Sequence, residues 1–164
     1  MTVVAKFDEL VRKIPGVSGY LDGENARAAD KALREHLAVE IGRLRHAIDG
    51  VVREQAERRD LAVLPLLDRL GSKLDAIASS IRFAAQGYRP LFEREPVGAA
   101  QLRRLYEYDR NLAAQIDTVR AHVDSLSAAG DDVSLRRDGQ ALEALLDTFA
   151  DVVRRRPDVL GTAE

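Results

Sequence analysis

The feature that most constrains this chain is a row of leucine and isoleucine residues that recurs at alternating intervals of three and four. This spacing places apolar side chains on one face of an α-helix, because the helix repeats about every 3.6 residues. Each row needs a partner surface to bury it, so the rows predict an all-α fold. Four successive segments carry them, at about residues 24–59, 63–87, 99–127 and 134–156.

Proline, glycine and aspartate separate these segments. Proline removes a backbone donor and disfavours helix in the residue before it, so helices end near such positions. An additional short amphipathic helix is expected before Pro15 and Gly16. Because short connections make successive helices antiparallel neighbours, we expect an antiparallel up-down-up-down four-helix bundle with the short N-terminal helix packed at one end.

The chain of 164 residues is expected to form a single helical-bundle domain. An N-terminal helix and loop are expected over 1–23, the bundle over 24–156 and a flexible tail over 157–164. The expectation of one domain rests on the even composition of the chain, which contains no low-complexity tract typical of a linker between domains.

Composition disfavours several classes of function. The net charge of −2 provides no overall attraction to nucleic acid, which is therefore not an expected partner. The chain contains no cysteine, so disulfides and thiolate sites are excluded. No segment approaches about 18 uncharged apolar residues, so we expect no integral membrane association. Lys6, Asp8 and Glu9 interrupt the apolar residues near the N-terminus, so we expect no secretory leader. A cytoplasmic location is the resulting expectation.

Two aspartates interrupt the apolar rows. Asp30 falls in the row of the first long segment and Asp109 in that of the third, each where an apolar residue would continue the spacing. The first and third helices run in the same direction in the expected topology, so both carboxylates should point inwards at a similar depth. A carboxylate buried without a partner costs several kcal/mol, so each needs a cation or a raised pKa.

Two interpretations of these aspartates remain open. They can pair with nearby arginines in a structural network that sets helix register, or they can line a site for a small ligand or a cation. A metal ion is not expected, because calcium takes about six to eight oxygen ligands, and no cofactor is expected. The candidate polar site comprises Tyr20, Glu24, Arg27, Asp30, Lys31, Arg34 and Asp109.

Part of this candidate site lies in a sequence pattern. Residues 19–34 read Gly-Tyr-x3-Glu-x2-Arg-x2-Asp-Lys-x-Leu-Arg. The pattern resembles one near the N-terminus of bacterial all-helical proteins that have no established activity. The resemblance therefore implies a helical segment without an activity that could be transferred. It coincides with the polar interruption of the first row, which is why we place candidate functional residues there.

No catalytic motif accompanies the apolar rows. The histidines His36, His46 and His122 lack the Glu-x-x-His spacing of di-iron bundles and are interpreted as solvated or boundary residues. There is no phosphate-binding loop and no nucleophile elbow. Two arginine clusters, at residues 53–59 and 154–156, are interpreted as solvated charge at helix ends.

The sequence therefore predicts a protein that is not an enzyme. We expect a helical bundle that binds a protein partner, or a second copy of itself as a homo-oligomer, through an exposed helix face. The alternative is a bundle that binds a small ligand or a cation at a polar site around Asp30 and Asp109.

Overall fold

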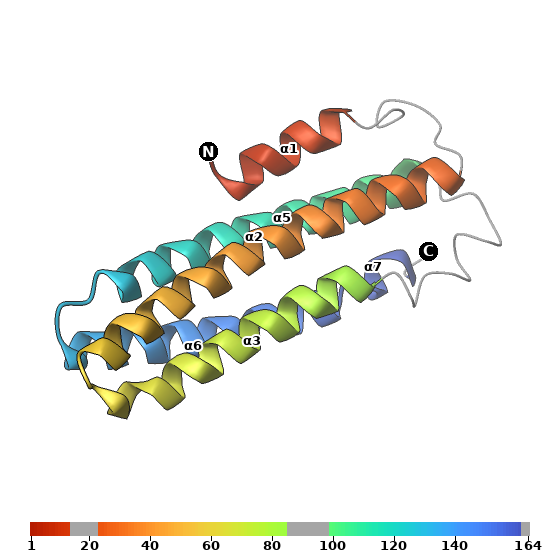
Figure 1. The fold of residues 1–164 in the computed structure, drawn as a ribbon. Coiled ribbons are helices and arrows are strands. Elements are labelled where there is room, and N and C mark those ends of the chain that lie inside the picture. The colour runs from red at the N-terminus through yellow and green to blue at the C-terminus, as the bar shows by residue number, and fades with distance from the viewer. Residues whose placement is uncertain (14–22, 85–98, 162–164) are drawn as a thin grey trace.

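A computed structural model describes residues 1–13, 23–84 and 99–161 (Figure 1). Within these ranges the chain is helical and contains no β-strand, which confirms the predicted all-α class. The elements are α1 (Val3–Lys13), α2 (Gly23–Glu57), the 3-10 helix η1 (Leu61–Val63), α3 (Leu64–Phe83), α5 (Ala99–Ser127), α6 (Asp132–Arg154) and α7 (Asp158–Gly161).

Local sequence signals explain where the described helices begin and end. After α2, Arg59 adopts a positive φ of 60°, and the Asp60 carboxylate then accepts a hydrogen bond from the Ala62 N–H at 3.3 Å. Pro65 lies in the first turn of α3, where its missing N–H costs nothing. Asp131 caps α6 by accepting from the Ser134 N–H at 2.9 Å, so α6 begins slightly earlier than expected.

The four long helices lie side by side (Figure 1). α2 packs against α3 and α5, and α6 packs against the same two helices. α2 and α5 begin at one end of the molecule, while α3 and α6 begin at the other. The helices α3 and α5 follow each other in sequence but do not form an extensively packed pair, so not all successive helices are neighbours.

The predicted apolar rows form the core. Most of their members are less than a tenth exposed and belong to one continuous cluster contributed by all four long helices, whereas Ala84, Leu145 and Val152 are partly buried against it. The buried members of the predicted rows are Leu33, Leu37, Ile41, Leu44, Ile48, Val51, Val63, Leu67, Leu70, Leu74, Ile77, Ile81, Leu102, Leu105, Leu112, Ile116, Val119, Val123, Leu126, Leu142, Leu146, Phe149 and Val153.

The short helix α1 lies along the side formed by α2 and α5, which corrects the expectation that it packs at one end (Figure 1). Val3 and Phe7 are buried against these helices. The Asp117 carboxylate of α5 accepts hydrogen bonds from the Val3 and Val4 N–H groups, at 2.9 and 3.2 Å. A carboxylate at a helix N-terminus satisfies unpaired donors and favours the helix dipole, so α5 itself caps α1.

The chain continues beyond α6 in a turn that leads into α7, where the sequence predicted a flexible tail from residue 157. α7 packs against α5. This contact places the residues that follow α6 over one end of the core. Among the described helices, none is both long enough and apolar enough to cross a membrane.

Candidate functional site

Asp30 and Asp109 lie in one buried layer. Asp30, on α2, is 2% exposed, and Asp109, on α5, is fully buried. Both carboxylates contact the same guanidinium group, so the inward orientation and similar depth predicted for them are present in the structure. α2 and α5 carry them to this layer because they pack together and begin at the same end.

The guanidinium belongs to Arg156, in the turn between α6 and α7. Its Nε donates to Asp109 Oδ1 and its Nη2 to Asp109 Oδ2, both at 2.6 Å. Nη2 also donates to Asp30 Oδ1 at 2.6 Å. Two parallel hydrogen bonds to one carboxylate form the strongest arginine geometry. Arg156 is fully buried, while Arg154 and Arg155 are exposed, so interpreting the whole run as solvated charge was wrong.

Arg34 extends the layer to α3. Its Nε donates to Asp30 Oδ2 at 2.8 Å. Its Nη1 donates to the carbonyl oxygens of Ile81, at 3.5 Å, and Arg82. These carbonyls lie in the last turn of α3, where the Ala84 N–H also donates to the Ile81 carbonyl oxygen. Arg34 therefore holds the end of α3 and one oxygen of Asp30 at the same time.

The charges of the layer balance, with two carboxylates against two guanidinium groups. Burial raises the pKa of the Asp109 carboxyl, and the charge and hydrogen bonds of Arg156 oppose that rise. Burial also disfavours the charged form of Arg156, but Asp109 and Asp30 outweigh it and raise the pKa of the guanidinium. Paired charges of this kind set geometry more than they add stability, since desolvation offsets much of their attraction.

Tyr106 of α5 lies beside the layer. Its side chain is 7% exposed, and its buried hydroxyl has no hydrogen-bond partner among the described residues. Burial raises the pKa of the phenol, and the negative charges of Asp30 and Asp109 raise it further. The hydroxyl is thus a buried polar group whose ionisation both carboxylates oppose.

The structure brings together Asp30, Arg34 and Asp109 of the predicted site. Arg27 and Lys31 are on α2 with exposed side chains. Glu24 lies in the first turn of α2, but its side chain falls outside the described residues, and Tyr20 lies outside them altogether. The predicted site is therefore reduced to its buried members.

Sequence reasoning missed Arg156, although a signal was present. The apolar row of the last segment runs through Leu142, Leu146, Phe149 and Val153, and the next step of three arrives at Arg156. Asp30 and Asp109 occupy equivalent places in their own rows. Continuing the last row by one step to Arg156, and pairing this cation with the two aspartates of the other rows, would have predicted the buried layer.

A second polar cluster holds α1. Glu40 of α2 is 1% exposed and accepts from Lys6, Arg43 and Arg120, at 3.4, 2.5 and 2.8 Å. Next to it His36 is partly buried, and its Nε2 has no hydrogen-bond partner among the described residues. Burial lowers the pKa of this imidazole. The cluster connects α1, α2 and α5 through one buried carboxylate.

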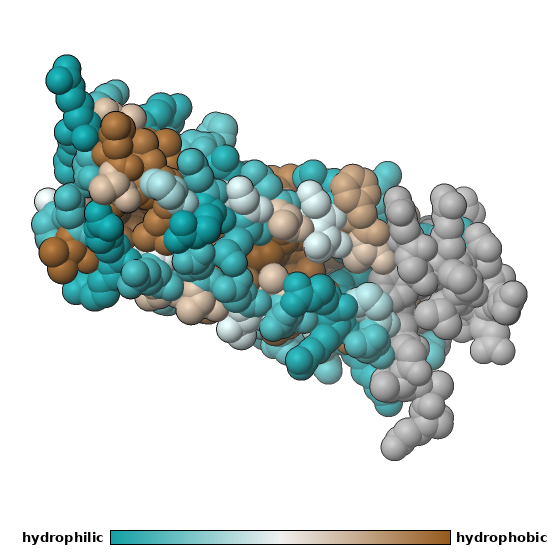
Figure 2. All heavy atoms as spheres, turned by 90° about the horizontal axis from the view of Figure 1, so that it is seen from below, coloured by the Kyte–Doolittle hydropathy of each residue, from teal (hydrophilic) through white to brown (hydrophobic). Residues whose placement is uncertain are grey.

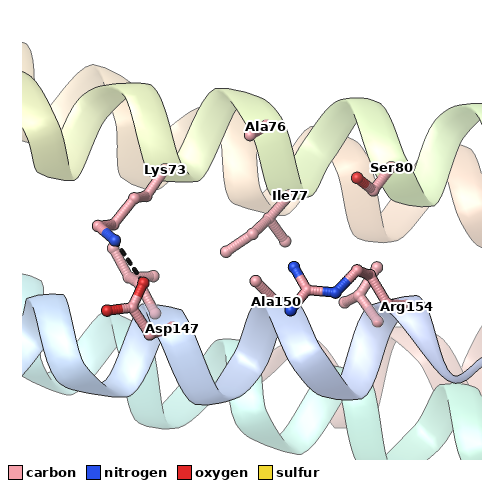
Figure 3. Close-up of a pocket in the computed structure, with 9 residues that line it drawn as sticks. Lys73, Ala76, Ile77, Ser80, Asp147, Ala150 and Arg154 are labelled. Atoms are coloured by element: carbon pink, nitrogen blue, oxygen red, sulfur yellow. Dashed lines mark hydrogen bonds and ion pairs between the residues drawn. The ribbon is translucent and has the colours of Figure 1, made fainter.

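A groove of about 240 Å³ lies between α3 and α6. Its floor includes Ile77 and Val153, which are buried, and apolar surface is visible in a hollow of this face (Figure 2). Lys73 and Asp147 face each other across the groove and form an ion pair (Figure 3). The groove is thus an apolar depression with charged side chains at its margins.

No protein-family model matches this sequence, and the comparisons with curated proteins and with solved structures give no significant match. Among the described residues, no group of three or more histidine, cysteine, aspartate or glutamate side chains is arranged to hold a metal ion.

Proposed function

We propose that this protein is a helical bundle without catalytic activity that binds a second copy of itself along the face formed by α3 and α6. The observation that carries the proposal is the groove of about 240 Å³ between these helices, with its apolar floor. Grooves between packed helices accept apolar side chains from another helix, which is a recurrent mode of protein recognition.

The frame for this function is an antiparallel up-down-up-down four-helix bundle, which we also propose. The packed pairs α2–α3 and α5–α6, each joined by a short connection, support it. The opposite directions of the helices within each pair support it as well (Figure 1).

A contrast between two faces supports the choice of α3 and α6. The face formed by α2 and α5 is covered by α1, whose Val3 and Phe7 are buried there. Among the described residues, no helix covers the face formed by α3 and α6 in the same way. At one end of the molecule, Leu61 and Val133 are also 65% and 78% exposed. An apolar surface of this kind is typical of an interaction site.

Charge complementarity favours a second copy as the occupant. α3 carries the basic residues Arg69 and Lys73, and α6 carries the acidic residues Glu143 and Asp147. Each basic residue lies at the same height along the bundle as one acidic residue, because Arg69 pairs with Glu143 at 3.0 Å and Lys73 pairs with Asp147. A two-fold axis parallel to the helices sets each α3 against the α6 of the other copy. The basic side chains of α3 then face the acidic side chains of α6 in the other copy. A two-fold axis perpendicular to the helices would instead set α3 against α3 and α6 against α6, so that like charges face each other.

Arginine substitutions in the groove test the proposal. Ala76→Arg and Ala150→Arg each place a long charged side chain over the apolar floor. We expect them to weaken a dimer at least tenfold, measured by size-exclusion chromatography with light scattering over a range of concentrations. Ala47→Arg, on an exposed position of α2, is the matched control. A wild-type protein that stays monomeric at every concentration contradicts the proposal.

A charge exchange tests the pairing of α3 with α6. Lys73→Glu and Asp147→Lys each create like charges across the proposed interface, so each variant alone should dimerise more weakly. An equimolar mixture of the two variants should recover dimers, because the carboxylate introduced on one copy then faces the ammonium group introduced on the other. Dimerisation that is insensitive to both substitutions would exclude this face.

A further inference from the structure

The buried layer points to a binding property that is independent of the face formed by α3 and α6. We infer that Asp30 and Asp109 form a guanidinium-binding site, which Arg156 occupies as the chain's own ligand and which accepts an arginine side chain of another polypeptide in exchange.

The site is built without Arg156. Asp30 and Asp109 are carried by α2 and α5, two long helices that pack directly against each other. The second oxygen of Asp30 is held at 2.8 Å by Arg34, whose other nitrogen is anchored on carbonyl oxygens at the end of α3. Arg34 therefore orients the Asp30 carboxylate independently of Arg156, and the packing of α2 against α5 sets the separation of the two aspartates. Preorganisation of this kind reduces the cost of binding.

The geometry selects a guanidinium group over other cations. Nε and Nη2 of Arg156 donate to the two oxygens of Asp109 as a planar fork, and Nη2 also reaches Asp30. A lysine ammonium is a single point of charge and cannot form two parallel bonds to one carboxylate. The expected ligand is therefore an arginine side chain rather than a lysine side chain.

Tyr106 provides an independent indication of a ligand site. Tyr106 lies on α5 one turn before Asp109, and its buried hydroxyl has no hydrogen-bond partner among the described residues. Buried polar groups are nearly always paired, with protein, water or ligand. This hydroxyl is thus available to a group that enters the layer in place of Arg156.

The present occupant is attached to the turn between α6 and α7, outside the four long helices. α6 ends at Arg154, and the following turn is held by a few backbone hydrogen bonds, including Asp158 N–H to the Arg155 carbonyl at 3.0 Å. Turns open locally more readily than the interiors of packed helices. Because departure of Arg156 removes the group that bonds both oxygens of the buried Asp109 carboxylate, exchange of one guanidinium for another is favoured over an empty site.

Removal of Arg156 allows the site to be tested with a defined probe. Arg156→Ala should lower the melting temperature, and N-acetyl-arginine amide should raise it again, by about 5 to 10 °C at about 100 times its Kd. The lysine analogue at the same concentration should have no such effect. Arg155→Ala, at the exposed neighbouring position, is the matched control and should not respond to the probe.

Further variants keep the inference falsifiable. Where Arg156→Ala does not fold, Arg156→Lys keeps a positive charge and should show the same selective response. Adding Asp109→Asn should abolish the response. Equal shifts from the arginine and lysine analogues, or none from either, would overturn the site.

Exchange in the wild-type protein is measured by hydrogen exchange. A peptide that contains arginine should accelerate exchange of the amides of residues 155–161, and the same peptide with lysine should not. Unchanged exchange with both peptides would overturn the proposal that another polypeptide replaces Arg156.

Discussion

Three buried charged residues define this protein at the residue scale. Asp30, Asp109 and Arg156 each occupy a position of an apolar row and are at most 2% exposed. Each would be strongly unfavourable alone in the core, but together they satisfy one another through bonds of 2.6 Å. The layer is therefore a unit, in which the loss of one member leaves another buried charge only partly compensated.

Removal of Asp109 should reveal this dependence. Asp109→Ala leaves Arg156 in the core with only part of its charge compensated, and we expect a loss of about 3 to 5 kcal/mol in the free energy of unfolding. Denaturant titration measures the change. Asp124→Ala, on an exposed position of the same helix, should change stability by less than about 0.5 kcal/mol. Similar small losses for both variants would contradict the buried network.

At the scale of the elements, α1 is held by features that only the packed helices provide. Asp117 of α5 caps its N-terminus, Arg110 of α5 pairs with Asp8 at 2.9 Å, and Glu40 of α2 pairs with Lys6. An isolated helix of eleven residues is marginal in water. α1 therefore depends on its contacts with α2 and α5, and conditions that alter those contacts should release it first.

Acidification should loosen α1 through His36. Burial lowers the pKa of this imidazole in the folded protein, so the undocked state binds the proton more tightly. The docking free energy is then complete above the ordinary histidine pKa of about 6.5 and is lost progressively as pH falls through the lowered value. Hydrogen exchange of the α1 amides measures this loss of docking free energy when it is compared at about pH 7 and about pH 5, on either side of the ordinary histidine pKa.

The other charged groups near His36 set the controls for this titration. Lys6 on α1, Arg43 on α2 and Arg120 on α5 surround the neighbouring Glu40. The pKa of Glu40 is lowered because these cations outweigh the effect of burial, so Glu40 stays ionised while His36 titrates. His36→Gln should remove the pH dependence, and His46→Gln, at an exposed position, should keep it. Persistence of the effect in His36→Gln would assign it to another group.

At the scale of the whole molecule, the buried layer connects all four long helices. Asp30 and Arg34 belong to α2, Asp109 to α5, Arg156 follows α6, and Arg34 reaches the end of α3. Apolar contacts alone are compatible with several helix registers, because one leucine or isoleucine side chain can take the place of another along a helix face. A layer in which every charge needs one particular partner accepts a single arrangement.

Replacing every charged residue of the layer with an apolar one tests whether the layer selects the helix register or stabilises the fold. The combined variant Asp30→Leu, Arg34→Met, Asp109→Leu and Arg156→Met should be as stable as the wild type or more stable by about 1 to 4 kcal/mol. Its helices should exchange between registers, seen as broadened resonances in amide NMR spectra. A strong loss of stability, or one set of sharp resonances, would show that the layer does not serve to select the register.

The helices could be predicted from the sequence because their signals are local. The interval of three and four residues identified the buried face of each long helix, and Asp30 and Asp109 were located on that face by the same count. Asp60 and Pro65 marked the turn between α2 and α3. The period of a helix determines which side chains share a face, whatever lies opposite.

The partners across the core were decided only by the tertiary structure. Arg156 and Asp30 are 126 positions apart, and nothing in the spacing of either row states which charge meets which. α1 lies on α2 and α5, where Asp117 and Glu40 face it. α3 does not pack extensively against α5, although α5 is the next described helix in the sequence. Sequence periodicity determines what a helix buries, while the choice of neighbour depends on how all the helices share one core.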